Sequence, residues 1–185
     1  MTTTRLMTLA AFTDEMKDLV RHGVDQKSVH RFLIESRIEC ATLAPLVRFE
    51  EGRYTRHLVY KNREVELLVL CWPSGSRAPV HGHEGELCWA RVERGRLRFT
   101  NYRETSRTPL RVLPVGDALD GAPGYLDGPA DLHAVENPAE FGAEAISLHV
   151  YCRPYDECDI YDLAAGLVRR VKLRYDSVPP GWTPT

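Results

Sequence analysis

The first fifty residues place their apolar side chains at helical spacing. Between residues 9 and 20 these positions recur three or four residues apart, at Leu9, Phe12, Met16, Leu19 and Val20. Gly23 follows as a stop signal, and Asp25 can cap a second helix that carries Val29, Phe32 and Leu33. A third short helical piece is predicted over 36–44. We therefore expect a helical segment over about 1–48.

From Tyr54 onward the period changes to two, which is typical of strands. The runs RYTRHLVY and EVELLVLCW are separated by Lys61-Asn62-Arg63, which predicts a hairpin. The runs LCWARV and RLRFTNY flank Glu93-Arg94-Gly95, which predicts a second hairpin with glycine in the turn. Further strand-like runs occupy 109–115, 145–152 and 171–175, and residues 116–131 look like loops rich in Gly, Pro and Asp.

This pattern predicts a mainly β fold in a single domain over 1–185. Many short strands separated by turn signals favour a β-barrel or sandwich over about 49–178, with the helices as a cap. The Pro-rich end of the chain is expected to be an irregular tail.

Composition narrows the function classes. A formal net charge of −2 over 185 residues argues against a nucleic-acid partner held by a broad basic field. The apolar runs are too short to span a membrane, and the N-terminus shows no signal peptide. Five scattered cysteines without a CxxC pair suit a reducing cytoplasm. No assembly segment stands out, so we expect a monomer.

Three histidines form a candidate metal site. His81 and His83 stand two residues apart, so on a strand both imidazoles point to one face. His133 follows fifty residues after His83, and three neutral imidazoles suit Fe(II), Zn, Ni or Cu. The alternative is that these are solvated or structural histidines on strands.

The spacing around these histidines resembles the motifs of the cupin barrels. Gly75, His81, His83 and Gly95 match the first motif, in which Cys88 replaces the usual glutamate. His133 and Asn137, four residues apart, match the end of the second motif. The resemblance implies a jelly-roll barrel for the β part of the chain.

A cupin with cysteine at the glutamate position resembles the thiol dioxygenases, and specifically the cysteine dioxygenase family. The matching segments are YTRHLV (54–59), LCW (70–72), DLHAVEN (131–137) and SLHVY (147–151). The resemblance implies that His81, His83 and His133 hold Fe(II). It also implies that L-cysteine and O2 react there to give cysteine sulfinic acid, without another electron donor.

The resemblance also implies roles for side chains around the iron. Arg56 is expected to hold the substrate carboxylate through its planar fork. Tyr54 and Trp72 are candidates for pocket walls or hydrogen-bond donors, although both could simply be barrel core. If the Arg56 face of its strand were solvated, Thr55, His57 and Val59 would point inward instead.

Ser147, His149 and Tyr151 alternate along one strand, so they share one face. The resemblance implies a relay in which Ser147 orients His149, and His149 orients the Tyr151 hydroxyl towards substrate and oxygen. Spacing alone leaves open that this face is simply wet. Cys88 and Tyr151 match the pair that forms a thioether crosslink in animal-type relatives, while an ordinary buried cysteine is the alternative.

Two positions depart from the family pattern. Arg153 occupies a Cys152-Arg153-Pro154 turn where relatives commonly have Ser-Pro-Pro, and it could turn inward as a second cation or remain solvated. Gly82 separates the two histidines in place of the common aspartate. An inward Arg153 would favour another thiol acid, such as 3-mercaptopropionate or mercaptosuccinate. A non-enzymatic metal-binding cupin is the third possibility.

Overall fold

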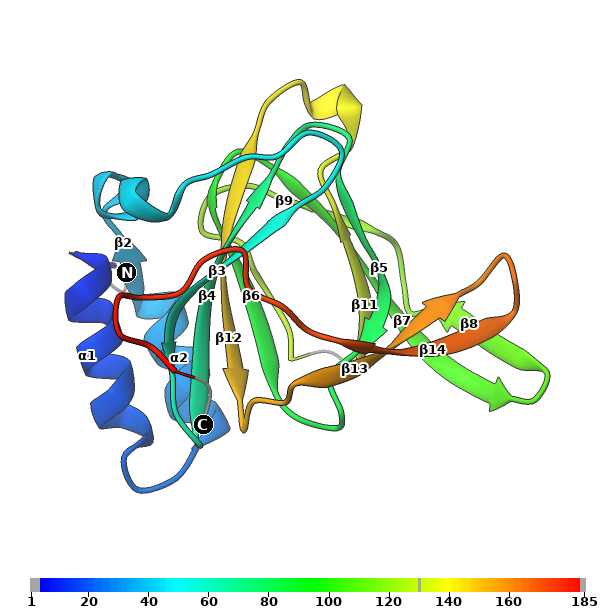
Figure 1. Cartoon of the computed structure of the whole chain (residues 1–185), viewed down its shortest axis with the longest axis horizontal. Coiled ribbons are helices and arrows are strands. Elements are labelled where there is room, and N and C mark those ends of the chain that lie inside the picture. Colours follow the sequence, from blue (N-terminus) through cyan, green and yellow to red (C-terminus); the bar gives the residue numbers. More distant parts are fainter. Residues whose placement is uncertain (1–3, 130, 184–185) are drawn as a thin grey trace.

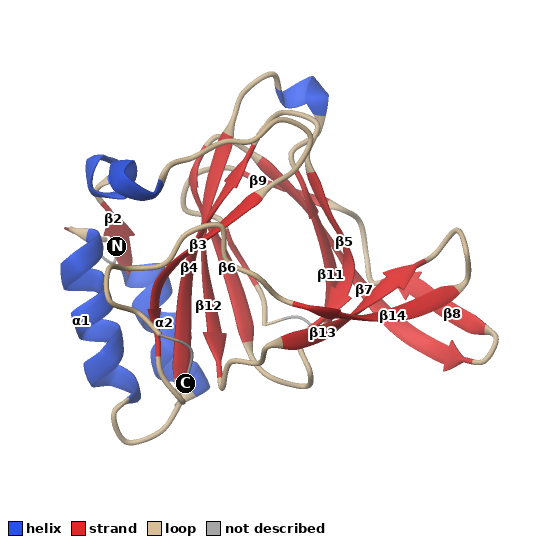
Figure 2. Cartoon of the chain, in the orientation of Figure 1, coloured by secondary structure: helices blue, strands red, loops and turns tan. Residues whose placement is uncertain are grey.

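The computed structural model describes residues 4–129 and 131–183, which form two facing β-sheets with helices packed on one side (Figures 1 and 2). The first sheet has the order β10-β6-β12-β4-β3, and the second has the order β14-β13-β5-β11-β7-β8, with β9 also pairing with β7. The predicted mainly β fold with an N-terminal helical segment is confirmed. Residues 1–3, 130 and 184–185, which include both ends of the predicted domain and tail, lie outside this description.

The strands of the facing sheets are β3 (Thr55–Lys61), β4 (Val65–Trp72), β5 (Arg77–Gly82), β6 (Cys88–Arg94), β7 (Leu97–Arg107), β8 (Leu110–Pro114), β9 (Leu119–Gly121), β10 (Leu126–Asp127), β11 (Leu132–Glu136), β12 (Ala145–Cys152), β13 (Glu157–Asp162) and β14 (Leu167–Lys172). A short 3-10 helix, Ala139–Phe141, joins β11 to β12. Two of these strands, β9 and β10, lie in the segment 116–131 that was predicted to be loop.

The first two helices form where the sequence predicts them. Helix α1 spans Leu9–Val20, and helix α2 spans Gln26–Glu35 with Asp25 as its cap, accepting a hydrogen bond from the first turn. Their buried faces include Phe12 and Val29, which pack against the first sheet. Burying each such side chain stabilises the fold by about 1.5–3 kcal/mol.

The third predicted helical piece was wrong in part. Strand β2 (Ser36–Ile38) runs parallel to β1 (Arg5–Met7), and a 3-10 helix follows over Cys40–Leu46. Ser36 and Ile38 are buried on either side of Arg37, so this stretch has the period of a strand rather than that of a helix. Cys40 is exposed rather than part of the core.

The buried Arg91 of β6 ties the helical layer to the barrel. Its Nε donates to Glu93 over 2.6 Å, and its Nη1 donates to the carbonyls of Leu33 and Ser36 over 2.8 and 2.9 Å. These carbonyls lie at the end of α2, where the helix can no longer pair them. The arginine therefore supplies a hydrogen-bond donor to buried carbonyls at the end of this helix.

Strands β3 and β4 form the predicted hairpin, with Thr55 opposite Cys71. The second predicted hairpin is wrong, because β6 and β7 belong to different sheets. Strand β6 already has β10 and β12 as neighbours, so no side is open to β7. Gly95 lies between them at φ +75°, and a Cβ there would come within 2.4 Å of the Glu144 carbonyl oxygen.

Both faces of the central strands β4 and β12 are buried. Leu67 and Val69 face the helices, whereas Leu68, Leu70 and Trp72 face the barrel interior. The same alternation in β12 directs Leu148 and Val150 outward to the helices. The polar residues of β12 therefore face the interior between the two sheets.

After β14 the chain returns to the first sheet, and this tail crosses β3 (red in Figure 1). The strand predicted over 171–175 ends earlier, at Lys172. The Leu58 nitrogen donates to the Ser177 carbonyl over 2.9 Å, and the Asp176 nitrogen donates to the Arg56 carbonyl over 2.7 Å. The tail therefore adds backbone hydrogen bonds along the outer edge of β3.

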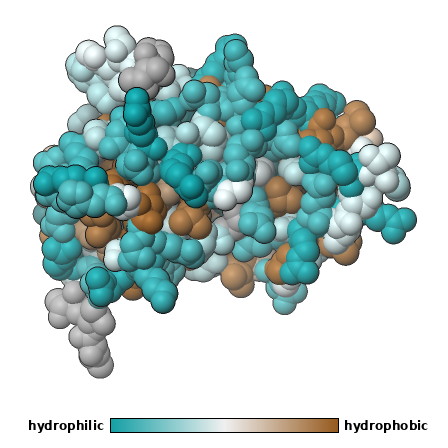
Figure 3. Space-filling view, turned by 90° about the horizontal axis from the view of Figure 1, so that it is seen from below, coloured by the Kyte–Doolittle hydropathy of each residue, from teal (hydrophilic) through white to brown (hydrophobic). Residues whose placement is uncertain are grey.

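The molecular face drawn in Figure 3 is mainly hydrophilic and carries separate apolar patches. Among the described residues, no helix is long and apolar enough to cross a membrane.

Candidate metal centre

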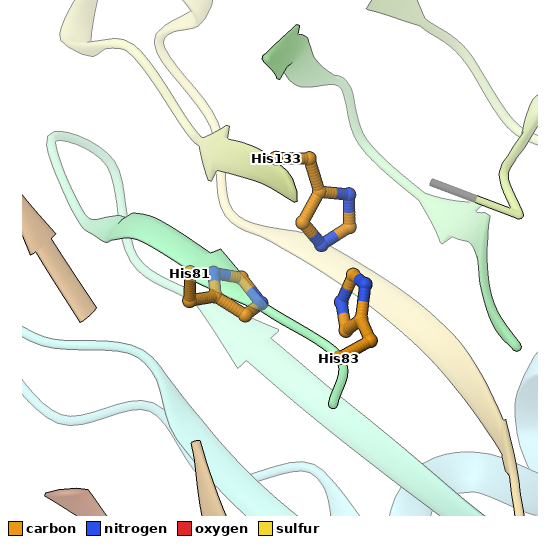
Figure 4. Close-up of side chains that lie close together, drawn as sticks. All are labelled: His81, His83 and His133. Atoms are coloured by element: carbon orange, nitrogen blue, oxygen red, sulfur yellow. The ribbon is translucent and has the colours of Figure 1, made fainter. Parts of the chain in front are cut away.

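His81, His83 and His133 converge between the two sheets. His81 lies in β5, His83 follows directly after this strand, and His133 lies opposite His81 on β11. Their ring centres are 4.7 to 5.2 Å apart, and one nitrogen of each ring lies within 4.8 Å of the others. Figure 4 shows the three rings turned towards a common centre. The tertiary structure thus assembles the predicted trio.

Hydrogen bonds at Nδ1 fix the orientation of two of the three rings. The Nδ1 of His133 lies 3.0 Å from Oδ2 of Asp127, a residue of β10 that is 3% exposed. The Nδ1 of His81 lies 2.9 Å from the Pro79 carbonyl oxygen. Both acceptors require a proton on Nδ1, so Nε2 carries the lone pair that can bind a metal. Asp127 was missed by sequence analysis, because it stands in a stretch that resembles a loop.

The chemistry of the three histidines fits a divalent transition metal. Burial, with a smaller contribution from the neighbouring imidazoles, lowers the pKa of His81 well below its usual range. Among the described residues, the Nε2 of His133 is buried and has no hydrogen-bond partner. A buried lone pair aimed at two other imidazoles is what a metal ligand requires.

A chain of hydrogen bonds runs along the interior face of β12. Trp72 Nε1 donates to Ser147 Oγ over 2.8 Å, and Ser147 Oγ lies 3.0 Å from His149 Nε2. The other nitrogen of His149, Nδ1, lies 3.3 Å from the Tyr151 hydroxyl. Ser147, His149 and Tyr151 are all buried, so their face is not simply wet.

Cys88 lies directly opposite Tyr151 in the β6–β12 ladder. Both side chains are buried, at 1% and 3% exposure, and both face the interior. Burial and then the nearby carboxylate of Asp127 raise the pKa of the Cys88 thiol well above its usual range. Burial also raises the pKa of Tyr151, so both groups keep their protons at neutral pH.

Arg56 points into the same interior, as predicted. Its Cζ lies 6.0 Å from the centre of the Tyr151 ring. Its Nε and Nη2 are buried and have no hydrogen-bond partner among residues 4–129 and 131–183. Tyr54 stacks on Trp72 with ring centres 4.7 Å apart, and both pack against the interior cluster. The structure therefore brings all the predicted site residues to one interior.

Comparison with known protein families identifies the family to which the chain belongs. The model of the family described as cysteine dioxygenase type I matches residues 1–164, which is most of the chain. The chain belongs to the cysteine dioxygenase type I family. The family match ends before the C-terminal tail that returns to β3.

Curated members of this family have similar sequences. Human cysteine dioxygenase type 1 is 28% identical over 137 residues, which are 72% of this chain and 68% of that protein. The cysteine dioxygenase type 1 of Danio rerio is 30% identical over 132 residues, which are 69% of this chain and 65% of that protein. A solved cupin superfamily protein from Desulfitobacterium hafniense is 14% identical, with a TM-score of 0.46 over 60% of this chain and 88% of that one.

Arg153, which departs from the cysteine dioxygenase pattern, is not a second cation in the site. Its side chain is 66% exposed and pairs with Glu86 over 2.7 Å. Its backbone has φ +55°, a conformation that costs a residue with a side chain some strain. Of the two alternatives for this residue, the structure supports the solvated one.

The other departure from the cysteine dioxygenase pattern, Gly82, has a packing explanation. Gly82 lies opposite Leu132 in the β5–β11 ladder. A Cβ at this position would lie 3.3 Å from the Leu132 side chain, which is tighter than ordinary van der Waals contact. A larger residue here would require the Leu132 side chain to move by a few tenths of an ångström.

Proposed function

We propose that this protein is a non-heme iron-dependent thiol dioxygenase that adds both atoms of O2 to the sulfur of L-cysteine, forming cysteine sulfinic acid. The observation that carries the proposal is the buried guanidinium of Arg56. Its unpartnered nitrogens share the interior with the three histidines and with Tyr151. An unpaired buried cation is costly, so an anionic ligand is its natural partner.

In the proposed mechanism, His81, His83 and His133 would hold Fe(II), which would supply the redox chemistry that O2 requires and favour the thiolate form of the substrate. Arg56 binds the substrate carboxylate, with both nitrogens of one edge available. Tyr54 and Trp72 form the adjoining wall through their stacked rings. Together these groups fix the position of the substrate sulfur relative to the histidines.

The relay residues set the direction of the Tyr151 proton. The indole N–H of Trp72 can only donate, so Ser147 satisfies its own buried proton by donating to His149 Nε2. Burial lowers the pKa of His149, so the ring is neutral and its remaining proton is on Nδ1. That proton is donated to the Tyr151 oxygen, which leaves the Tyr151 hydroxyl hydrogen available to the substrate and oxygen.

Cys88 is proposed to form a thioether bond to the ring of Tyr151. The reaction removes the thiol hydrogen and one ring hydrogen, and O2 accepts the two electrons. The bond would hold the Tyr151 ring in place beside Arg56. We also propose that the protein works as a monomer in a reducing cytoplasm, where its four cysteines other than Cys88 would remain thiols.

The proposal is tested by loading the purified protein with Fe(II) without oxygen and then supplying single thiols in aerated buffer. We expect oxygen uptake with L-cysteine and a product heavier than cysteine by two oxygen atoms. A higher activity with 3-mercaptopropionate or mercaptosuccinate than with L-cysteine would identify that thiol as the substrate instead. Iron binding without uptake with any thiol would identify a metal-binding cupin instead.

A substitution of Arg56 tests its binding role. Arg56→Ala should lower kcat/KM for L-cysteine by about a hundredfold, because a charged hydrogen-bonded pair is lost. Cysteamine (2-aminoethanethiol) lacks the carboxylate, so its kcat/KM should change little. Arg153→Ala is the matched control, because this arginine is exposed and should leave both substrates unaffected.

A further inference from the structure

A row of interior side chains crosses the first sheet beside the site. In the strand register Lys61 lies directly opposite Glu66, and Glu66 lies directly opposite Tyr151. Glu66 follows the alternation of β4 that directs Leu68 and Trp72 into the barrel. Its side chain is only 2% exposed. A buried carboxylate therefore stands next to Tyr151, outside the set of residues that the sequence singled out.

Glu66 is held by two partners on the side away from Tyr151. Lys61 Nζ lies 3.5 Å from Glu66 Oε1, and the Tyr175 hydroxyl donates to the same oxygen. Lys61 is also fixed by Asp156 at 2.7 Å and by the Tyr175 hydroxyl at 3.1 Å. Tyr175 belongs to the C-terminal tail, and its ring packs edge-on against Trp182.

Lys61 and Tyr175 also line a surface cleft of about 690 Å³, together with Trp182. These two side chains thus stand between this cleft and Glu66. The adjacent residue of the tail, Asp176, accepts a hydrogen bond from the Arg56 backbone nitrogen over 2.7 Å. The same short segment therefore supports the backbone of Arg56 and the carboxylate of Glu66.

Arg56 and Glu66 are in electrostatic reach of each other. Arg56 lies over the ring of Tyr151, and Glu66 is the neighbour of Tyr151 on the next strand. Burial opposes the charged form of Arg56, and Glu66 is one of the groups, after Tyr151 and Tyr54, whose charge raises the pKa of Arg56. A buried carboxylate and a buried guanidinium with open nitrogens gain strongly from pairing. In this protein they are not hydrogen-bonded to each other, and Glu66 is bound by Lys61 and Tyr175 instead.

We propose that Lys61 and Tyr175 hold Glu66 away from Arg56, and that this keeps the guanidinium open for the carboxylate of the substrate. Lys61, Glu66 and Tyr175 are then specificity-determining positioning residues for thiols that carry a carboxylate. The inference rests on the proposed function to the extent that Arg56 is the carboxylate anchor.

The test measures binding rather than turnover. The protein is loaded with Zn(II), which supports no oxygen chemistry, and L-cysteine and cysteamine are titrated by calorimetry. In Lys61→Met, Glu66 loses the cation that balances its charge, so it should pair with Arg56 and weaken L-cysteine binding by about tenfold. Cysteamine, which has no carboxylate, should bind as it does to the unaltered protein.

A double variant tests whether the charge of Glu66 causes the loss of L-cysteine affinity. In the double variant Lys61→Met/Glu66→Gln the competing charge is absent, so L-cysteine affinity should return to within about threefold of its original value. Lys172→Met is the matched control, because this exposed lysine lines the same cleft but is not a partner of Glu66. Tyr175→Phe is the milder variant, and it should weaken L-cysteine binding in the same direction as Lys61→Met.

The proposal is overturned if Lys61→Met and Tyr175→Phe bind L-cysteine as well as the unaltered protein does. It is also overturned if the affinity of a folded Lys61→Met/Glu66→Gln protein stays low, because the loss would then be structural. The outcome of this binding test can be distinguished from the outcome of the test of the proposed function. Absence of oxygen uptake in the iron-loaded protein would reject the dioxygenase activity, whereas the calorimetric comparison tests the control of Arg56 directly.

Discussion

Tyr151 and Cys88 face each other across neighbouring strands in the barrel interior, at directly paired positions of the β6–β12 ladder. Directly opposed side chains in an antiparallel pair have Cβ atoms about 4.5–5.5 Å apart. This spacing places the sulfur of one residue beside the ring of the other. The two residues proposed to form the crosslink are thus direct neighbours across the ladder.

The proposed crosslink predicts a mass change. Protein purified after aerobic expression with iron should contain a fraction lighter by two hydrogen atoms, seen by mass spectrometry of the intact chain. Cys88→Ser should remove that fraction. Cys152→Ser is the control, because Cys152 is adjacent to Tyr151 in sequence but packs on the helical side. A full-mass protein after many turnovers would reject the crosslink.

Asp127 should control metal affinity through His133. Asp127→Asn keeps the size of the side chain but removes its charge, so it weakens the hold on the Nδ1 proton of His133. We expect a loss of metal affinity of about 10–100-fold, measured by competition with a chelator that reports free metal. Asp120→Asn should leave the affinity unchanged, because Asp120 instead pairs with Arg98. Equal affinities for both variants would contradict the role of Asp127.

Trp72→Phe tests the direction of the relay. This change keeps most of the ring that stacks on Tyr54 but removes the N–H that Ser147 accepts. Ser147 can then turn its proton away from His149, so kcat should fall by about tenfold while KM changes little. Trp89→Phe is the control, since the Trp89 nitrogen has no hydrogen-bond partner among the described residues. A change in KM alone would assign Trp72 to substrate packing.

His57 should make the stability of the tail contact dependent on pH. Its Nδ1 lies 2.8 Å from Ser177 Oγ and its Nε2 lies 2.9 Å from Thr55 Oγ1. Burial lowers the pKa of His57, whereas the unfolded chain takes up the proton at about 6.5. Protons therefore favour the unfolded state, and stability present above about pH 6.5 is lost as the pH falls towards the folded pKa.

The measurement for His57 is the melting temperature between pH 8 and pH 5. His57→Gln can keep one hydrogen bond but cannot titrate, so it should lose less stability on acidification than the unaltered protein. The difference between the two melting temperatures should narrow as the pH falls. A constant difference across this range would show that His57 is not protonated on unfolding.

Local sequence signals predicted much of the fold. The caps and helical spacing of the first thirty-five residues were sufficient for α1 and α2, because helix ends depend on nearby side chains. The hairpin of β3 and β4 was likewise encoded by its own turn. Strands β6 and β7 were not paired as expected, because pairing depends on the neighbours that a strand meets in the finished barrel.

The site residues also divide into those that the sequence predicted and those that it did not. The spacing of His81, His83 and His133 and the family resemblance predicted which side chains would meet. Asp127, Lys61, Glu66 and Tyr175 carry no such signal, because isolated charged or aromatic residues are common on strands and loops. Their roles follow from the partners that they reach across the molecule.

The sequence by itself therefore determined the helices, the alternation of the strands and the candidate ligands, since all of these depend on periodicity and spacing along the chain. Only the tertiary structure decided that Arg56 points inward with open nitrogens, that Arg153 stays in solvent, and that Glu66 is held by the tail. These outcomes depend on burial and on contacts between residues distant in sequence. Their energies are set by the dielectric surroundings and partners that folding creates.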